Sequence, residues 1–284
     1  MIQNDNHLRE YLMSRRVIGI ASSTLKKELS ILQLFLNETL KDLSEITTKD
    51  VRDYFNSINK LKASTIETRV IVLKSFFVYL QEQKVIEHNP TLFLKCPKIP
   101  LRVPQTISVS EVEELLSVPS SSSFYDLRDK AILEVLYGTG IRQSELGGLK
   151  LNDIDFDSKI MLIYGKGNKE RLIPLTARVI TALKDYIIKG RTQKIDIPNQ
   201  WLWLNHFGYQ FCKSKFSRLV QSYAVKAGLS KSVSCHTLRR SFATHLLQRG
   251  VNPYHISKLL GHSGLQTIDH YLAVSVDDLR QLHL

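Results

Sequence analysis

The chain has 284 residues, of which 43% are hydrophobic and 23% charged, a composition typical of a globular protein with room for about two domains. Its apolar runs fall well short of the roughly 18 residues of a membrane-spanning helix. Its first residues, MIQNDNHLRE, lack the layout of a signal peptide. These features argue against a membrane partner and predict a cytoplasmic protein.

The net charge of +12 is spread along the chain, with 15 basic against 11 acidic residues up to position 100 and 24 against 16 after it. Cationic surface gains affinity for nucleic acid by displacing counterions from phosphates, so nucleic acid is the expected partner. The cysteines Cys96, Cys212 and Cys235 are odd in number and show no C-x-x-C spacing. They suggest neither a disulfide framework nor a zinc site.

The first hundred residues carry the apolar spacing of helices. Apolar side chains recur at steps of three and four over 25–36 and 66–80, and TTKDVRDYF is typical of a shorter helix between them. The residues expected to open these helices are Ser22 or Ser23, Thr47 or Thr48, and Ser64 or Thr65. We therefore predict a helical bundle over residues 1–98.

The stretch NPTLFLKCPKIPLRVPQ carries four prolines, which disfavour helix and predict a linker at residues 99–106. A second domain, residues 107–284, would open with the helix SVSEVEELL, capped by Ser108 or Ser110. In it we expect strands at 160–164 and 171–175, joined by GKGNKE, and helices within 126–140, 176–188, 211–227, 237–249 and 253–260. The expected fold class is mainly α with a small β-sheet.

Four separated motifs carry residues suited to a phosphate. GTGIRQSELGGL holds Arg142 and Glu145, the hairpin tip YGKGNKERLIPL holds Lys166, CHTLRRSFATHLL holds His236 and Arg239, and LLGHSGLQTIDHYLAV holds His262 and Tyr271. Each motif has an ordinary explanation by itself: an ion pair on a helix surface, an exposed basic hairpin, a capping histidine or a core tyrosine. Together they fit one chemistry.

Cleavage of a DNA phosphodiester needs a nucleophile, positive charge near the non-bridging oxygens and a proton for the leaving 5′ oxygen. Two arginines from different segments can clamp the phosphate without a metal ion. A lysine on a glycine-flanked tip can act as general acid, and histidines can move protons near neutral pH. A tyrosine nucleophile conserves the bond energy in a covalent phosphotyrosine, so no ATP or other cofactor is expected.

On these motifs, and over almost the whole chain, the sequence resembles the tyrosine recombinase, or lambda-integrase, family. The family order is Arg, Lys, His-x-x-Arg, His or Trp, and Tyr, and the spacings and the tail YLAVSVDDLRQLH are similar to the Xer branch. The resemblance implies that residues 1–98 form a helical core-binding clamp on DNA and residues 107–284 an α+β catalytic domain. Arg240 stands where many relatives carry histidine, and Leu272 and Ala273 where many carry Thr-His; neither difference touches the catalytic set.

The resemblance also implies a role for each motif residue. The implied roles are nucleophile for Tyr271, general acid for Lys166, phosphate binding for Arg142 and Arg239, proton transfer for His236 and His262, and orientation of Arg142 for Glu145. No metal ligand is expected. Basic residues on the helices and beside the hairpin tip would contact DNA, mostly at its phosphates. The residues expected to do so are Lys62, Arg69, Lys74, Lys169, Arg171, Lys213, Lys215 and Arg218.

The apolar residues after Tyr271 have two interpretations. They could form a C-terminal helix on their own domain. The resemblance implies instead that the tail docks on a neighbouring protomer, cyclically, in a homotetramer that holds two double-stranded DNA sites. A second recombinase or an accessory protein as a further partner stays open.

We expect no extra N-terminal arm-binding domain, which favours an Xer-like enzyme or a TnpI-type transposon resolvase that resolves chromosome dimers or cointegrates. The runner-up is a compact mobile-element integrase. A catalytically silent DNA-binding accessory protein of the same fold also stays open, although the intact set of motif residues argues against it. A type IB topoisomerase would not match the N-terminal pattern, and a metal nuclease would need clustered carboxylates in the motifs.

Overall fold

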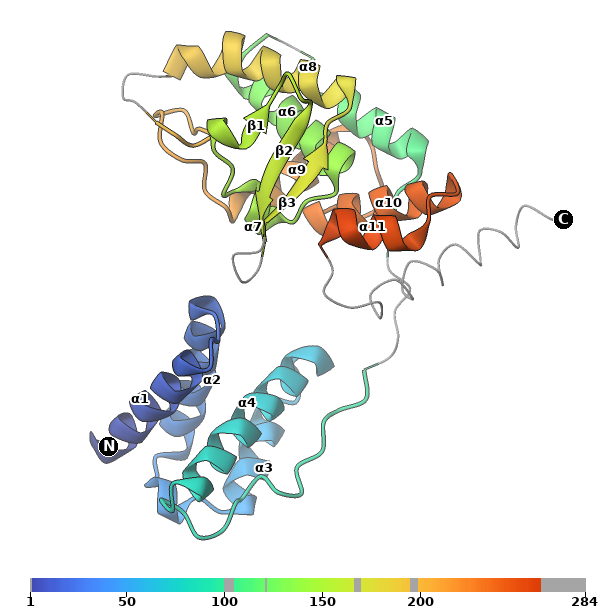
Figure 1. Cartoon of the computed structure of the whole chain (residues 1–284). Coiled ribbons are helices and arrows are strands. Elements are labelled where there is room, and N and C mark those ends of the chain that lie inside the picture. The colour runs from blue at the N-terminus through green and yellow to red at the C-terminus, as the bar shows by residue number, and fades with distance from the viewer. Residues whose placement is uncertain (1, 100–104, 121, 166–169, 195–198, 262–284) are drawn as a thin grey trace, which may run out of the picture. The chain divides into compact units, whose positions relative to one another are not determined.

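The structure is a computed structural model that describes residues 2–99, 105–120, 122–165, 170–194 and 199–261 (Figure 1). The chain divides into two compact units, Met1–Arg102 and Val103–Leu284. The described residues are mainly helical with one small three-stranded sheet, as predicted. No helix in this part of the chain is long and apolar enough to cross a membrane.

The described part of the first unit packs four α-helices around one apolar core. These are α1 (Ile2–Val17), α2 (Ser22–Thr39), α3 (Thr48–Ser57) and α4 (Ala63–Glu82), with a short 3₁₀ turn, η1 (Leu43–Glu45), between α2 and α3. Phe35 of α2 and Phe77 of α4 are fully buried in that core. Helix α1 was not predicted as a separate helix, because Leu8 and Tyr11 are its only members of the buried core among the described residues. The hydroxyl of Tyr11 donates to Ser75 Oγ (3.0 Å) and ties α1 to α4.

The helix starts differ in part from the predicted caps. Thr47, one of the two threonines expected to open α3, is its N-cap, and it forms a capping box with Asp50 that was not predicted. In contrast, the N-cap of α2 is Ala21, so the predicted caps Ser22 and Ser23 are wrong; α4 begins at Ala63, directly before the expected Ser64, with Lys62 as its N-cap. Neither Ala21 nor Lys62 makes a side-chain capping bond, and the serines and threonine after them lie in the first helical turn. Burial of the apolar faces therefore stabilises α2 and α4 without that bond.

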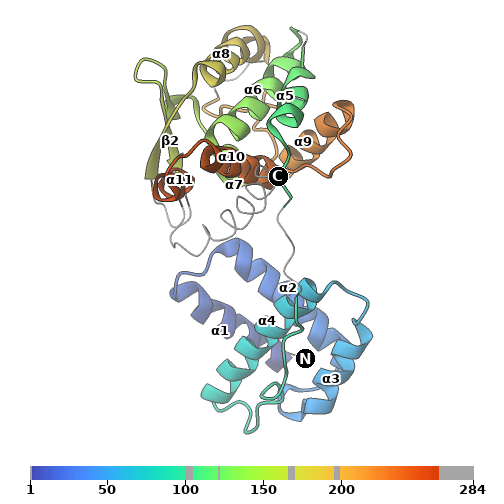
Figure 2. The same cartoon turned by 90° about the vertical axis from the view of Figure 1, so that its right-hand side faces the viewer.

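The second unit is built around a central helix, α6. Its described elements are α5 (Val109–Ser117), α6 (Phe124–Thr139), α7 (Gln143–Leu146), η2 (Leu151–Asp153), β1 (Ile154–Asp155), β2 (Ile160–Tyr164), β3 (Glu170–Pro174), α8 (Ala177–Asp185), η3 (Tyr186–Gly190), η4 (Arg191–Lys194), α9 (Lys215–Lys226), α10 (Cys235–Gln248) and α11 (Pro253–Leu260). Helix α6 packs against α5, α8 and α10, and its residues 131–136 are all buried. In both views α10 and α11 lie side by side (Figures 1 and 2), and α11 also contacts β3.

The sheet is antiparallel in the order β1-β2-β3. Met161 pairs with Ile173, and Ile163 pairs with Arg171. Because side chains alternate across a strand, Arg171 lies on the same face as the buried Ile173, toward the core. Strand β1 was not predicted, since two residues are too short to show an alternating pattern.

Four predicted helices have different limits in the structure. Helix α6 begins at Phe124, two residues before the predicted start at 126. Helix α8 ends at Asp185 and continues as a π-helical turn, η3, and a 3₁₀ turn, η4. Helix α9 begins at Lys215 instead of position 211, because the N–H of Phe211 donates to the carbonyl of Trp203 (2.8 Å) and residues 213–214 form a turn. Helix α10 begins two residues earlier than predicted, where Ser234 caps it by accepting from the N–H of Thr237.

Candidate active site

Arg142 and Glu145 form the first part of the site, with Arg142 as the N-cap of α7 and Glu145 within that helix. The backbone N–H of Arg142 donates to Glu145 Oε2 (2.7 Å), and its Nη1 donates to Oε1 (2.8 Å). The Glu145 side chain is only 3% exposed, whereas that of Arg142 is 32% exposed. The predicted pair therefore joins a buried carboxylate to an arginine that still reaches solvent.

Arg171 of β3 binds the same carboxylate from the other side. Its Nη1 donates to Glu145 Oε1 (2.9 Å) and its Nη2 to Oε2 (2.7 Å). Each carboxylate oxygen thus accepts two bonds, one from Arg142 and one from Arg171. Burial raises the pKa of Glu145, but the bonds from Arg171 and Arg142 outweigh it and lower the pKa to about 2. Arg171 was expected to contact the DNA backbone, and these bonds to Glu145 were not predicted.

Arg239 of α10 is 5% exposed and links two segments through their backbone. Its Nη1 donates to the carbonyl of Gly140 (2.7 Å), and its Nη2 donates to the carbonyl of Leu260 (2.7 Å). Gly140 closes α6 in the left-handed conformation (φ 61°), two residues before Arg142. Arg239 therefore holds the turn that carries Arg142 against the end of α11.

Three arginines meet at the C-terminal end of α11. Arg171 Nε donates to the carbonyl of Leu259 (2.8 Å), Arg239 Nη2 to that of Leu260 (2.7 Å) and Arg142 Nη2 to that of Gly261 (3.1 Å). Carbonyls at a helix C-terminus lack intrahelical partners and carry the negative end of the helix dipole, so cations stabilise them. The end of α11 thereby gathers side chains from β3, α7 and α10 at one place.

His236 lies in the first turn of α10, and its side chain is exposed. Desolvation by neighbouring atoms and the positive charges of Arg239, Arg240 and Arg142 lower its pKa below the usual histidine value. The electrostatics therefore favour the neutral imidazole, which can accept a proton.

A hydrogen-bond network that was not predicted from the sequence joins the residues next to Arg142 and His236 through α9 and the residue Lys213 before it. Gln143, next to Arg142, donates through Nε2 to the carbonyl of Lys213 (2.7 Å) and accepts through Oε1 from Ser217 Oγ (2.7 Å). Ser217 also contacts the sulfur of Cys235 (3.7 Å), next to His236, and burial raises the pKa of that thiol. The network fixes α9 against α7 and α10.

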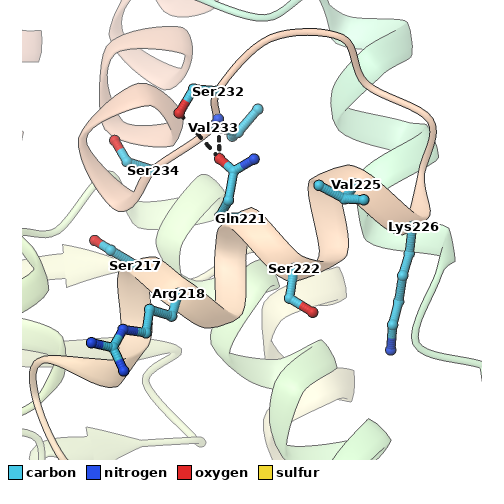
Figure 3. A pocket seen from close by; sticks show the side chains of 9 residues that line it. All are labelled: Ser217, Arg218, Gln221, Ser222, Val225, Lys226, Ser232, Val233 and Ser234. Carbon is cyan, nitrogen blue, oxygen red and sulfur yellow. Dashed lines mark hydrogen bonds between the residues drawn. The ribbon is translucent and has the colours of Figure 1, made fainter.

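A hollow of about 680 Å³ lies beside this network, between α9 and the segment that enters α10 (Figure 3). Gln221 points from α9 to that segment and accepts from the N–H of Val233 (2.8 Å) and the hydroxyl of Ser232 (3.2 Å). Arg218 and Lys226 of α9 also line the hollow. Both of these side chains are basic, and Arg218 is one of the predicted DNA contacts.

The structure places the other predicted site residues as follows. Lys166, Lys169, His262 and Tyr271 lie outside the described residues. Lys62, Lys213, Lys215 and Arg218 are exposed, and Lys74 is half-buried. Arg69 donates to the hydroxyl of Tyr54 (2.7 Å). Among the described residues, no group of three or more His, Cys, Asp or Glu side chains could hold a metal ion.

The arrangement suits an anion. Arg142 uses two guanidinium N–H groups in its described side-chain bonds, out of five that a guanidinium carries. It is part-exposed, permanently charged and held on two sides. A phosphate next to it would also lie near the cations that surround His236.

Comparison with known proteins places the chain in a family. Residues 105–277 match the phage integrase family, and residues 6–84 match the N-terminal SAM-like domain of phage integrases. The tyrosine recombinase XerC of Myxococcus xanthus is 37% identical over 255 residues, covering 88% of this chain and 85% of its own. The tyrosine recombinase XerD of Yersinia pestis is 34% identical over 292 residues, covering 100% and 98%.

A solved structure shows the same fold. The dimer of lambda integrase (75–356) bound to a COC′ core site superposes with a TM-score of 0.74 at 20% identity, covering 94% of both chains. With the helical unit and the α+β unit both matched, the chain belongs to the phage integrase family of tyrosine recombinases.

Proposed function

We propose that this enzyme cuts and rejoins double-stranded DNA at specific sites through a 3′-phosphotyrosine intermediate and a Holliday junction. One observation carries the proposal: Arg142 and Arg239 both donate to carbonyls at the end of α11, and His236 lies close enough to feel the positive charge of both. Its breaking-rejoining chemistry needs neither ATP nor a metal ion in this scheme. DNA as the substrate supports action in the cytoplasm.

The proposed residues account for every bond change and proton transfer in the cleavage. The phenolic oxygen of Tyr271 forms a bond to the scissile phosphorus as the bond to the 5′ oxygen breaks. Lys166 gives a proton to that oxygen, and His236 and His262 assist in taking the proton from the tyrosine. Arg142 and Arg239 stabilise the charge on the non-bridging oxygens. Religation runs these steps in reverse: the 5′ hydroxyl of another strand gives up its proton and bonds to phosphorus, while the bond to the Tyr271 oxygen breaks and that oxygen is protonated.

Glu145 and the end of α11 support the two arginines in this scheme. A guanidinium held by a buried carboxylate loses little further freedom when the phosphate arrives. The low pKa of Glu145 keeps that carboxylate charged over the whole working range of pH. Arg142 therefore meets the phosphate in one orientation.

Dimer or cointegrate resolution is the biological role that we favour. Its support is the match to XerC and XerD relatives along nearly their full lengths. We further propose a homotetramer on two DNA sites, with the tail after Tyr271 docked on the neighbouring protomer. We also propose that basic side chains contact the phosphates of DNA. These are the exposed Lys62, Lys213, Lys215 and Arg218 and the half-buried Lys74.

The test uses nicked duplex fragments tiled across the DNA that flanks the gene of this protein. A covalent adduct that survives SDS and disappears with protease is expected for the wild type and not for Tyr271→Phe. DNA binding by Tyr271→Phe should be nearly intact. Binding without an adduct in the wild type would favour the silent accessory protein, and equal adduct in Tyr271→Phe would remove Tyr271 from the nucleophile role.

A further inference from the structure

Arg171 occupies a position in the site that the roles above leave unexplained. It binds both oxygens of Glu145 and the carbonyl of Leu259 with three separate nitrogens. We propose that Arg171 is a positioning residue for cleavage: it holds Glu145 and the end of α11 in the arrangement that presents Arg142 to the phosphate. The inference rests on the proposed role of Arg142 as a phosphate ligand.

Arg171 can affect Arg142 because both side chains bind the carboxylate of Glu145. Glu145 accepts four bonds, two from each arginine, which fills the acceptor sites of a carboxylate. Without Arg171, two of these sites lose their donors while the side chain stays buried. The carboxylate would then draw the second guanidinium nitrogen of Arg142 or take up a proton, and either change alters the group that faces the phosphate.

Backbone geometry shows that the contact with α11 is close. Gly261 ends α11 in the left-handed conformation (φ 64°), and its carbonyl accepts from Arg142. A Cβ atom there would lie 3.0 Å from Nη1 and 3.2 Å from Cζ of Arg171. The guanidinium thus rests against the residue directly before His262 in the sequence, and the absence of a side chain lets it approach.

The alternative role, a direct contact with the DNA backbone, suits the structure less well. The Arg171 side chain is 13% exposed, whereas that of Arg142 is 32% exposed. Arg171 lies on the same face of β3 as the buried Ile173, toward the core. Three N–H groups of its guanidinium are already bonded. DNA contact would require it to leave Glu145.

The first arm of the test needs no DNA. Carboxyl ¹³C NMR of glutamate-labelled protein would follow Glu145, assigned with Glu145→Gln, in the wild type, Arg171→Ala and Arg171→Lys. Arg178→Ala is the matched control, since Arg178 binds the buried Glu134 (2.7 Å) with no described contact to the site. Arg171→Ala should raise the pKa of Glu145, Arg171→Lys should raise it less, and Arg178→Ala should leave it unchanged. An unchanged pKa in Arg171→Ala would overturn the inference.

The second arm measures adduct formation at saturating protein on the nicked duplex that traps the wild type. Arg171→Ala should bind this DNA normally but cleave it roughly tenfold to hundredfold more slowly. Arg171→Lys should recover part of the rate, and Arg178→Ala should cleave as the wild type does. In the double variant with Glu145→Gln, the loss should be well below the product of the two single losses, because both act through one carboxylate.

Several results would contradict the positioning role. A normal rate in Arg171→Ala, a loss that multiplies fully with that of Glu145→Gln, or weakened DNA binding with a normal rate at saturation would each overturn it. Equal losses in Arg171→Ala and Arg178→Ala would indicate a merely structural effect and would do the same. Failure of the wild type to form any Tyr271-dependent adduct would instead overturn the proposed function, and this inference with it.

Discussion

The guanidinium of Arg239 donates to the carbonyl of Gly140, 99 residues earlier in the chain, at 2.7 Å. Gly140 can accept this bond because it adopts φ 61° with α10 and α11 packed closely against it. A Cβ atom at this position would lie 2.4 Å from Phe242 Cδ1 and 2.9 Å from Leu260 Cδ2. The turn before Arg142 is therefore shaped by a glycine, an arginine and the packing of two later helices.

Gly140→Ala should destabilise the second unit by about 2–4 kcal/mol, since left-handed strain and overpacking act together. Gly228→Ala is the matched control, because its φ is 75° but nothing lies within 4 Å of its Cβ position. It should cost only the strain, about 1–2 kcal/mol. Both tryptophans, Trp201 and Trp203, belong to the second unit, so tryptophan fluorescence in a urea titration reports on it. Equal losses in the two variants would show that α10 and α11 yield to the added methyl group.

Glu145 should make the stability of the second unit depend on pH. Its pKa falls from 4.5 to about 2 on folding, so its contribution is complete above 4.5 and is lost as the pH falls toward 2. The shift corresponds to a contribution on the order of 3 kcal/mol. Tryptophan-monitored unfolding should show Glu145→Gln to be less stable at pH 7, with a gap from the wild type that narrows below pH 4.5. A gap that stays constant down to pH 2.5 would contradict the low pKa.

His236 should respond to the charge of Arg240. The positive charges near the ring help to lower its pKa, so Arg240→Gln should raise the pKa by removing one of them. Imidazole NMR of the DNA-free protein measures this shift, and Lys226→Gln, which removes an exposed cation of α9, is the control. When the pH is lowered, the cleavage rate of Arg240→Gln should begin to fall at a higher pH than that of the wild type, because His236 takes up its proton earlier. An unchanged pKa of His236 in Arg240→Gln would show that the charge of Arg240 does not lower it.

Much of this organisation follows from local sequence signals. The helical spacing over 25–36 and 66–80, the capping box at Thr47 and the strand at 160–164 all depend on neighbours within a few residues. The predicted pairing of Arg142 with Glu145 is of the same kind, since the two are three residues apart.

The inward orientation of Arg171 could have been predicted from the sequence. Its alternation with Ile173 indicates the buried face of β3, but a predicted strand that began at 171 left it at the edge of the hairpin tip. The bond from Arg239 to Gly140 is different, because it depends on how α10 packs against α6. No local pattern records such a contact, and the same holds for the three carbonyls at the end of α11.

The proposed general-acid role of Lys166 can be tested separately from the roles of the other site residues. As the general acid it would protonate the leaving 5′ oxygen, so Lys166→Ala should slow adduct formation, roughly a hundredfold or more. Replacing the bridging 5′ oxygen with sulfur should restore much of the rate, because a thiolate leaves without a proton. Arg142→Ala is the control: it weakens charge stabilisation on the non-bridging oxygens, which sulfur at the 5′ position does not replace. Rescue of both variants, or of neither, would remove Lys166 from the acid role, whereas rescue of Lys166→Ala alone would assign the proton to it.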